Sequence, residues 1–129
     1  MRRSDQRRAA VVALYQSEVT GRPANDLLEP TARDFTRELV EGVQRDRPDL
    51  DAVIEHYSVD WSLDRIAPLE KSIMRVALHE LTSRPDVPPE VVIDEAVEAA
   101  KELCSADAPK FVNGVLGSAH RAATEAPAK

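Results

Sequence analysis

The sequence predicts an all-α protein that forms one domain. Apolar residues recur at helical spacing in several runs rich in Ala, Leu, Glu and Arg, and only four glycines occur among the 129 residues. No run alternates apolar and polar residues cleanly enough to indicate a β-strand. A chain of this length can bury roughly two thirds of its surface, which is enough for a hydrophobic core. We expect a single helical domain over residues 1–129, with halves at 1–58 and 59–123 and a frayed tail at 124–129.

The first helix is expected over residues 5–19, where Val11 and Leu14 lie on one apolar side. Ser4 or Asp5 can cap its N-terminus, because their side-chain oxygens can accept from free backbone N–H groups. The apolar side predicts that this helix packs against the rest of the domain.

A loop over residues 21–30 separates the first helix from the second. Thr31 and Asp34 resemble a capping box at the start of the second helix. Proline disrupts a helix interior, so the second helix is expected to end near Pro48. Residues 50–57 then form a short third helix.

The second half is expected to begin at a corner around Trp61, which we interpret as a core anchor between the halves. A short turn over residues 63–66 follows. The next helix spans residues 68–83 and is expected to be central to its half, because its apolar stripe is broad. Pro68 suits the first position of a helix, where its missing N–H costs little.

Two further helices are expected on either side of a break at residues 105–106. Pro88 and Pro89 mark the start of the first, and Cys104 falls on its wide apolar face as a buried structural thiol. Asp107 is the expected N-cap of the second.

The N-terminal part of the last helix has two interpretations. Gly114 and Gly117 lie on a second face with little bulk, which suits either a close helix crossing or a bare surface for a ligand. Lys110 and Phe111 lie at the N-terminal end of this helix, where a helix favours phosphate. Phe111 is either a stacking platform or a core residue.

Charge is unevenly placed along an acidic chain. The formal net charge is −6, which argues against a generic nucleic-acid binder, yet four arginines fall within the first eight positions. This pattern is compatible with selective RNA contact, and a solvated tail is the alternative. The sequence has no run of 18 apolar residues that would predict a membrane span, and no apolar signal core follows the N-terminus. A single cysteine cannot form an intramolecular disulfide, which fits the reducing cytoplasm.

No catalytic or metal-binding pattern is found in the sequence. His56, His79 and His120 fall on different predicted helices, and with one cysteine they lack metal-ligand spacing. No glycine-rich phosphate loop or nucleophile elbow occurs, so we expect neither catalysis nor a cofactor. Lys71, Arg75 and His79 are spaced by four residues and therefore lie on one side of a helix. This side is either a solvated face or a partner-binding face.

Three blocks of the sequence resemble the NusB family of transcription antitermination proteins. They are RRAAVVALYQ near the start, WSLDRIAPLEKSIMRVALHEL in the middle, and VPPEVVIDEAVEAAKEL followed by KFVNGVL. The blocks occur in the family's order across residues 2–121, which makes the match specific. The resemblance implies about seven helices in two small packed bundles, and a function without catalysis.

The resemblance also implies partners and site residues. NusB proteins pair with the ribosomal protein NusE, and the pair binds boxA, a single-stranded RNA element, so that RNA polymerase reads through terminators in ribosomal RNA operons. The implied RNA-binding residues are Arg3, Arg7, Arg8, Asp107, Lys110 and Phe111. Tyr15 and Glu70 match positions that bind NusE, and Arg75 is a further partner-binding candidate on the aligned face.

The sequence differs from the family pattern at some positions, and other functions are also compatible with it. His79 stands where many members have Tyr, and Ala108-Pro109 replaces a more polar pair at the RNA edge. One alternative is a helical interaction module or homodimer without an RNA role. Another is the related domain of rRNA cytosine methyltransferases, although this chain has no Rossmann-like segment or catalytic Cys motif.

Overall fold

The computed structural model describes residues 2–59 and 61–125, and these residues confirm the all-α prediction. The α-helices are α1 (Arg3–Thr20), α2 (Asp34–Tyr57), α3 (Pro68–Ser83), α4 (Pro89–Leu103) and α5 (Ala108–Glu125), with short 3₁₀ helices η1 (Ala24–Leu27) and η2 (Leu63–Arg65). The expected number of about seven helices is wrong, because the described chain has five α-helices and η1 and η2 are single turns. The predicted tail lies largely outside the described residues.

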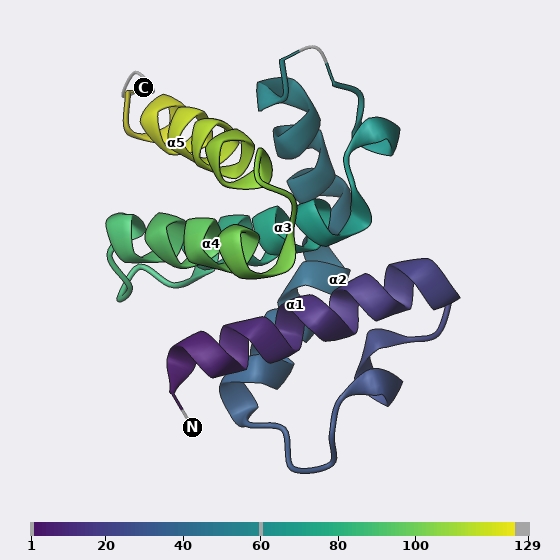
Figure 1. The fold of residues 1–129 in the computed structure, drawn as a ribbon. Helices are drawn as coiled ribbons and strands as arrows, with labels where there is room; N and C mark the ends of the chain where they lie inside the picture. The colour runs from purple at the N-terminus through teal and green to yellow at the C-terminus, as the bar shows by residue number, and fades with distance from the viewer. Residues whose placement is uncertain (1, 60, 126–129) are drawn as a thin grey trace.

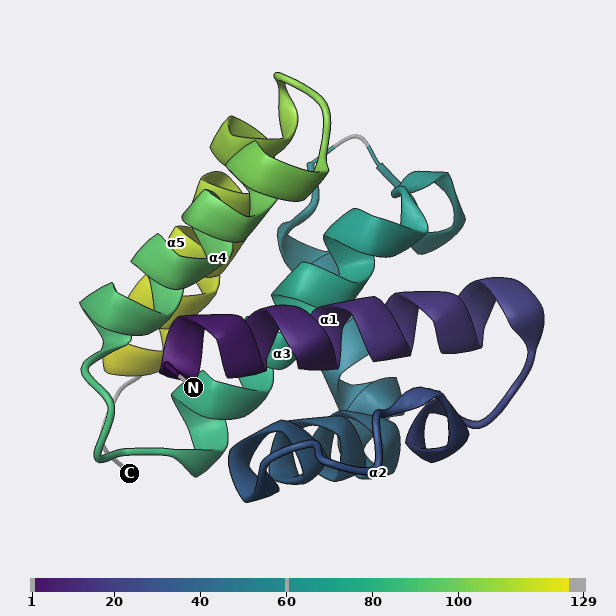
Figure 2. The ribbon, with the colours of Figure 1, turned by 60° about the horizontal axis from the view of Figure 1, so that its bottom comes forward.

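Helix α3 lies at the centre of the molecule. Helices α1 and α2 pack against it and against each other, while α4 and α5 form a pair that also contacts α3 (Figure 1). Figure 2 shows α1 crossing in front of α3, with α2 on one side and the α4–α5 pair on the other. The broad apolar stripe explains the central position, because Ile73, Met74 and Leu78 are all buried.

The predicted break at Pro48 is wrong, because α2 runs through it as one 24-residue helix. Val43, Leu50 and Ile54 stay in phase on one buried face across the proline. An interior proline costs about 3 kcal/mol. Burial of a Leu or Ile side chain contributes roughly 1.5–3 kcal/mol each, so the continuous apolar face outweighs this cost. Pro48 itself is exposed, where water can reach the backbone carbonyl that it leaves free.

Backbone signals at the helix ends were more reliable than the predicted side-chain caps. Gly21 ends α1 with a φ of 78° and donates its N–H to the Ser17 carbonyl, and Pro68 occupies the first turn of α3 as expected. The predicted Ser4, Asp5 and Thr31 caps are wrong. Helix α1 begins after Arg2 and α2 begins after Arg33, and neither residue makes a side-chain capping hydrogen bond.

The polar side of α3 is not the solvated face that the sequence suggested. Arg75 is 3% exposed and His79 is 2% exposed, because α1 and α2 cover this side. The Arg75 guanidinium donates to Asp51 at 2.6 and 3.1 Å and to Glu18 at 2.7 Å. The charged side chain of Arg75 on α3 therefore connects α1, α2 and α3. The helical spacing of polar residues in the sequence does not distinguish such buried ion pairs from a solvated face.

Candidate nucleic-acid interface

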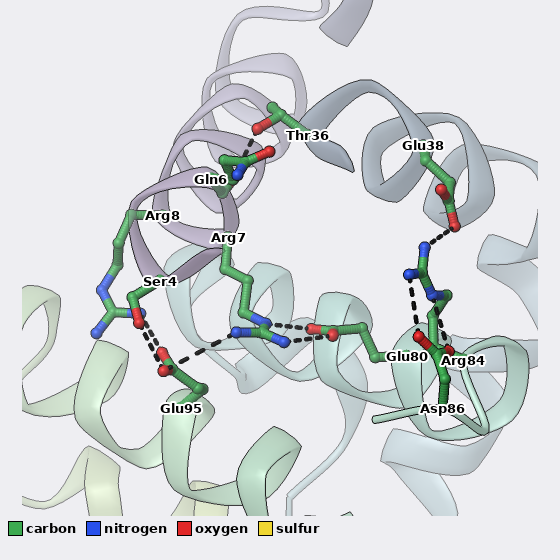
Figure 3. A network of polar contacts seen from close by, with 10 residues as sticks. All are labelled: Ser4, Gln6, Arg7, Arg8, Thr36, Glu38, Glu80, Arg84, Asp86 and Glu95. Atoms are coloured by element: carbon green, nitrogen blue, oxygen red, sulfur yellow. Dashed lines mark hydrogen bonds and ion pairs between the residues drawn. The ribbon is translucent and has the colours of Figure 1, made fainter. Parts of the chain in front are cut away.

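Arg7 lies inside the molecule, bound to a carboxylate of α3. Its Nε donates to Glu80 Oε2 at 2.7 Å, and its Nη2 donates to Glu80 Oε1 at 2.9 Å (Figure 3). Arg7 is 7% exposed and Glu80 is 1% exposed, so both charges are withdrawn from water. A bidentate pair in this setting ties α1 to α3, and it occupies the guanidinium that the sequence assigned to RNA.

Arg8 lies nearer the surface and bridges α1 to α4. Its guanidinium donates to Glu102 at 2.9 and 3.3 Å and lies 3.6 Å from Glu95, which also accepts from Ser4 at 2.6 Å. These carboxylates, chiefly Glu102, raise the pKa of Arg8. Its side chain is 18% exposed, so part of the guanidinium remains at the surface.

Arg3 is exposed and stacks on an aromatic ring of α2. Its guanidinium carbon lies 4.1 Å from the centroid of Phe35, within the range of a cation–π contact. The guanidinium carbons of Arg7 and Arg84 lie 5.4 and 5.3 Å from the same centroid. Phe35 therefore holds Arg3 against the protein at the surface end of α1.

A groove of about 370 Å³ lies where η2 and the first turn of α3 meet the start of α5. It is lined by Trp61, Arg65, Ile66, Ala67, Glu70, Asp107 and Phe111. Two of the predicted RNA residues, Asp107 and Phe111, thus meet at one site, together with the predicted partner residue Glu70. Lys110 precedes Phe111 and is exposed.

Trp61 is not the core anchor that we expected, because it is 50% exposed on the wall of this groove. The core between the helices is filled instead by aliphatic side chains from α2 and α3. Trp61 and Arg65 are the groove residues that the sequence analysis missed. A tryptophan outside any helical apolar stripe, in a segment with polar neighbours, was the available signal.

Burial changes the acidity of two groups beside the groove. Loss of water contact raises the pKa of the Glu70 carboxyl, against a hydrogen bond from the backbone at Ala67. Burial, with the nearby Glu70 charge, also raises the pKa of the Cys104 thiol to about 11. Cys104 is half-buried, and at neutral pH it is a protonated thiol rather than a nucleophile.

The predicted partner-binding residues do not form one exposed cluster. Tyr15 is half-buried on α1, and Glu70 faces the groove. Arg75 is enclosed by its contacts with Asp51 and Glu18. The side chain of Arg75 therefore shapes the α1–α2–α3 junction rather than offering an open contact surface.

Some basic residues of the described chain are held in ion pairs, and others are not. Arg7, Arg75 and Arg84 are held in ion pairs within the protein. In the part of the chain that the structure describes, Arg3, Arg65 and Lys110 have no carboxylate within 4 Å. Of these three residues, Arg65 lines the groove, and Lys110 is exposed one residue before the groove residue Phe111.

The described residues contain neither a metal-binding cluster nor a helix long and apolar enough to cross a membrane. No three His, Cys, Asp or Glu side chains within residues 2–59 and 61–125 are placed to hold a metal ion.

Sequence comparison decides the family. The NusB family matches residues 4–121 of the chain. The chain belongs to the NusB family. A NusB transcription antitermination protein from Rubrobacter xylanophilus is 42% identical over 125 residues, covering 92% of this chain and 90% of the relative.

Solved structures of NusB proteins share the fold. NusB of T. maritima aligns with a TM-score of 0.84 at 29% identity, covering 94% of this chain and 92% of that chain. A crystal structure of the antitermination factors NusB and NusE in complex with double-stranded RNA aligns with a TM-score of 0.79 at 26% identity, covering 93% and 96%.

Proposed function

We propose that this chain is a transcription antitermination factor that binds boxA RNA together with the ribosomal protein NusE. The observation that carries the proposal is the groove, which Trp61, Phe111 and the cation Arg65 line, with Lys110 exposed one residue before Phe111. Single-stranded RNA is recognised by this combination of aromatic stacking and basic contacts. The names of the relatives and the NusB–NusE–RNA structure support the same role.

Residue roles follow from exposure. Arg3, Arg8 and Lys110 contact phosphates, and Phe111 stacks on a base, with Asp107 at its side. Arg7 supports this edge from within, because its pair with Glu80 fixes the first turns of α1 against α3. The proposed RNA contacts therefore fall in two places, the N-terminal end of α1 and the groove.

NusE is the proposed protein partner, and Tyr15 and Glu70 are its proposed contacts. Arg75 contributes indirectly, since it holds Glu18 on the same helix as Tyr15. The assembly acts without catalysis on RNA polymerase in the bacterial cytoplasm, where nascent transcripts are made. A homodimer of this chain would compete with the assembly if it covered the same edge.

Fluorescence anisotropy of a labelled boxA oligomer tests the proposal. The protein is titrated into the oligomer with and without its cognate NusE, beside a scrambled oligomer of equal length. Tighter binding to boxA that NusE strengthens is the expected result. Equal affinity for both oligomers, with or without NusE, would refute the proposed function, and light scattering of the same samples would show whether a homodimer is present.

A further inference from the structure

The groove between η2 and α5 has the apolar character of a site for a flat ring. Trp61 is half-exposed on one part of its wall, Phe111 is half-buried on another, and Ile66 is buried at 4% exposure among the lining residues. Leaving a tryptophan half in water forgoes part of the free energy of its burial, and exposed aromatic rings are enriched where ligands bind.

Two carboxylates limit what this ring can be. Glu70 and Asp107 both line the groove, so a phosphate placed there would meet two negative charges. Carboxylate oxygens instead accept hydrogen bonds from exocyclic amino groups of bases, as when Glu or Asp accepts from cytosine N4. Half-burial of Glu70 strengthens such a contact, because water competes less for the carboxylate.

One cation, Arg65, lines the groove together with the two carboxylates. Arg65 is exposed on η2 and Lys110 is exposed at the start of α5, so the two approach from different elements. A strand with its base in the groove can direct its phosphates outward toward these side chains. Because Arg65 lines the groove together with both carboxylates, the site offers a cation to a phosphate and acceptors to a base, which favours a nucleotide over a free anion.

We propose that this groove is a nucleobase pocket in which Trp61 and Phe111 stack on an RNA base and Glu70 and Asp107 select a base with an exocyclic amino group. The proposal rests on the proposed function, and it adds Trp61 and Arg65 as binding residues and a base preference. Among pyrimidines it predicts that the pocket takes cytosine and disfavours uracil, whose O4 would face a carboxylate oxygen.

Trp61 is the only tryptophan of the chain, so its fluorescence reports directly on the pocket. We would titrate the full chain with hexamers of cytidine and of uridine, which differ at this edge and have rings of similar size. Cytidine is expected to quench Trp61 at about tenfold lower concentration than uridine. The double variant Glu70→Ala with Asp107→Ala should lose this preference and still be quenched.

Binding of boxA RNA by anisotropy provides the second measurement. Trp61→Ala should weaken binding about tenfold, whereas Val59→Ala, a change of a 76% exposed neighbour outside the groove, should leave it unchanged. Circular dichroism of each variant checks that the fold is retained.

The outcomes separate the two proposals. If boxA RNA binds by anisotropy but Trp61 fluorescence does not change, the pocket is refuted and the antitermination function stands. If cytidine quenches Trp61 selectively but boxA RNA is not preferred over its scrambled form, the pocket stands and the antitermination function fails. Equal quenching by cytidine and uridine, or none by either, overturns the base selection.

Discussion

The pair formed by Arg7 and Glu80 makes Arg7→Ala the most informative substitution in the molecule. Removal of the guanidinium leaves the Glu80 carboxylate, 1% exposed, without its bidentate partner. Breaking a buried ion pair from one side typically costs about 3–5 kcal/mol, because the remaining charge stays desolvated. Since domains are stable by about 5–15 kcal/mol, this loss is a large fraction of the total.

Urea unfolding followed by circular dichroism measures the effect. With a slope near 2 kcal/mol per molar urea, the midpoint of Arg7→Ala should fall by about 2 M. Arg8→Ala is the matched control, because its hydrogen-bonded partner Glu102 is 57% exposed and its contact with Glu95 is longer, at 3.6 Å, so its loss should cost less than that of Arg7. The double variant Arg7→Met with Glu80→Leu removes both charges and should recover most of the stability.

RNA binding of the same variants decides between structural and direct roles. When a protein no longer touches one phosphate of a single strand, the slope of log affinity against log salt falls by about 0.7. We expect this reduction for Arg8→Ala and not for the double variant. A stable Arg7→Ala protein whose salt slope falls by about 0.7 would refute the structural role and return Arg7 to the RNA surface.

Four further outcomes are expected. Gly42→Ala should destabilise the protein despite a gain of roughly 1 kcal/mol in helix propensity, because its Cβ would overlap the His79 imidazole, and adding His79→Ala should restore stability in urea unfolding. Burial lowers the pKa of His79 below 6.5, so its contribution to stability is complete above pH 6.5 and is lost as pH falls below it; His79→Leu should weaken this dependence between about pH 7.5 and 5.5. Phe111→Leu should weaken boxA binding with little change in melting temperature, and a large melting drop would instead place Phe111 in the core. Glu70→Lys should impair pairing with NusE in a pull-down while leaving the helical spectrum intact, and normal pairing would count against that contact.

The apolar pattern was sufficient for the helices but not for the polar contacts between them. Helix α3 was placed at residues 68–83 because its stripe and its first proline are both local signals. The continuity of α2 through Pro48 was missed, since it depends on a buried face that only the packed structure reveals. Arg7 and Arg75 were assigned to the surface for a similar reason, because their partners Glu80 and Asp51 are distant in sequence.

Only part of the groove could be predicted from the sequence. Phe111 and Asp107 lie one helical turn apart and were predicted together, whereas Trp61 and Glu70 reach them only through the packing of α3 against α5. The polar neighbours of Trp61 were a signal of its exposure, but its position beside Phe111 had to be observed.

The distribution of charge explains how an acidic chain can bind RNA selectively. Arg7 and Arg75 are neutralised inside the protein, so they hold helices together without adding attraction for distant phosphates. With a net charge of −6, long-range electrostatics repel RNA as a whole. In the site that we propose, affinity comes from short-range contacts in which a base stacks on Trp61 and Phe111 while Lys110 reaches a phosphate. A strand that cannot place a base in the groove gains little from the remaining surface, which makes the acidic composition itself a source of specificity.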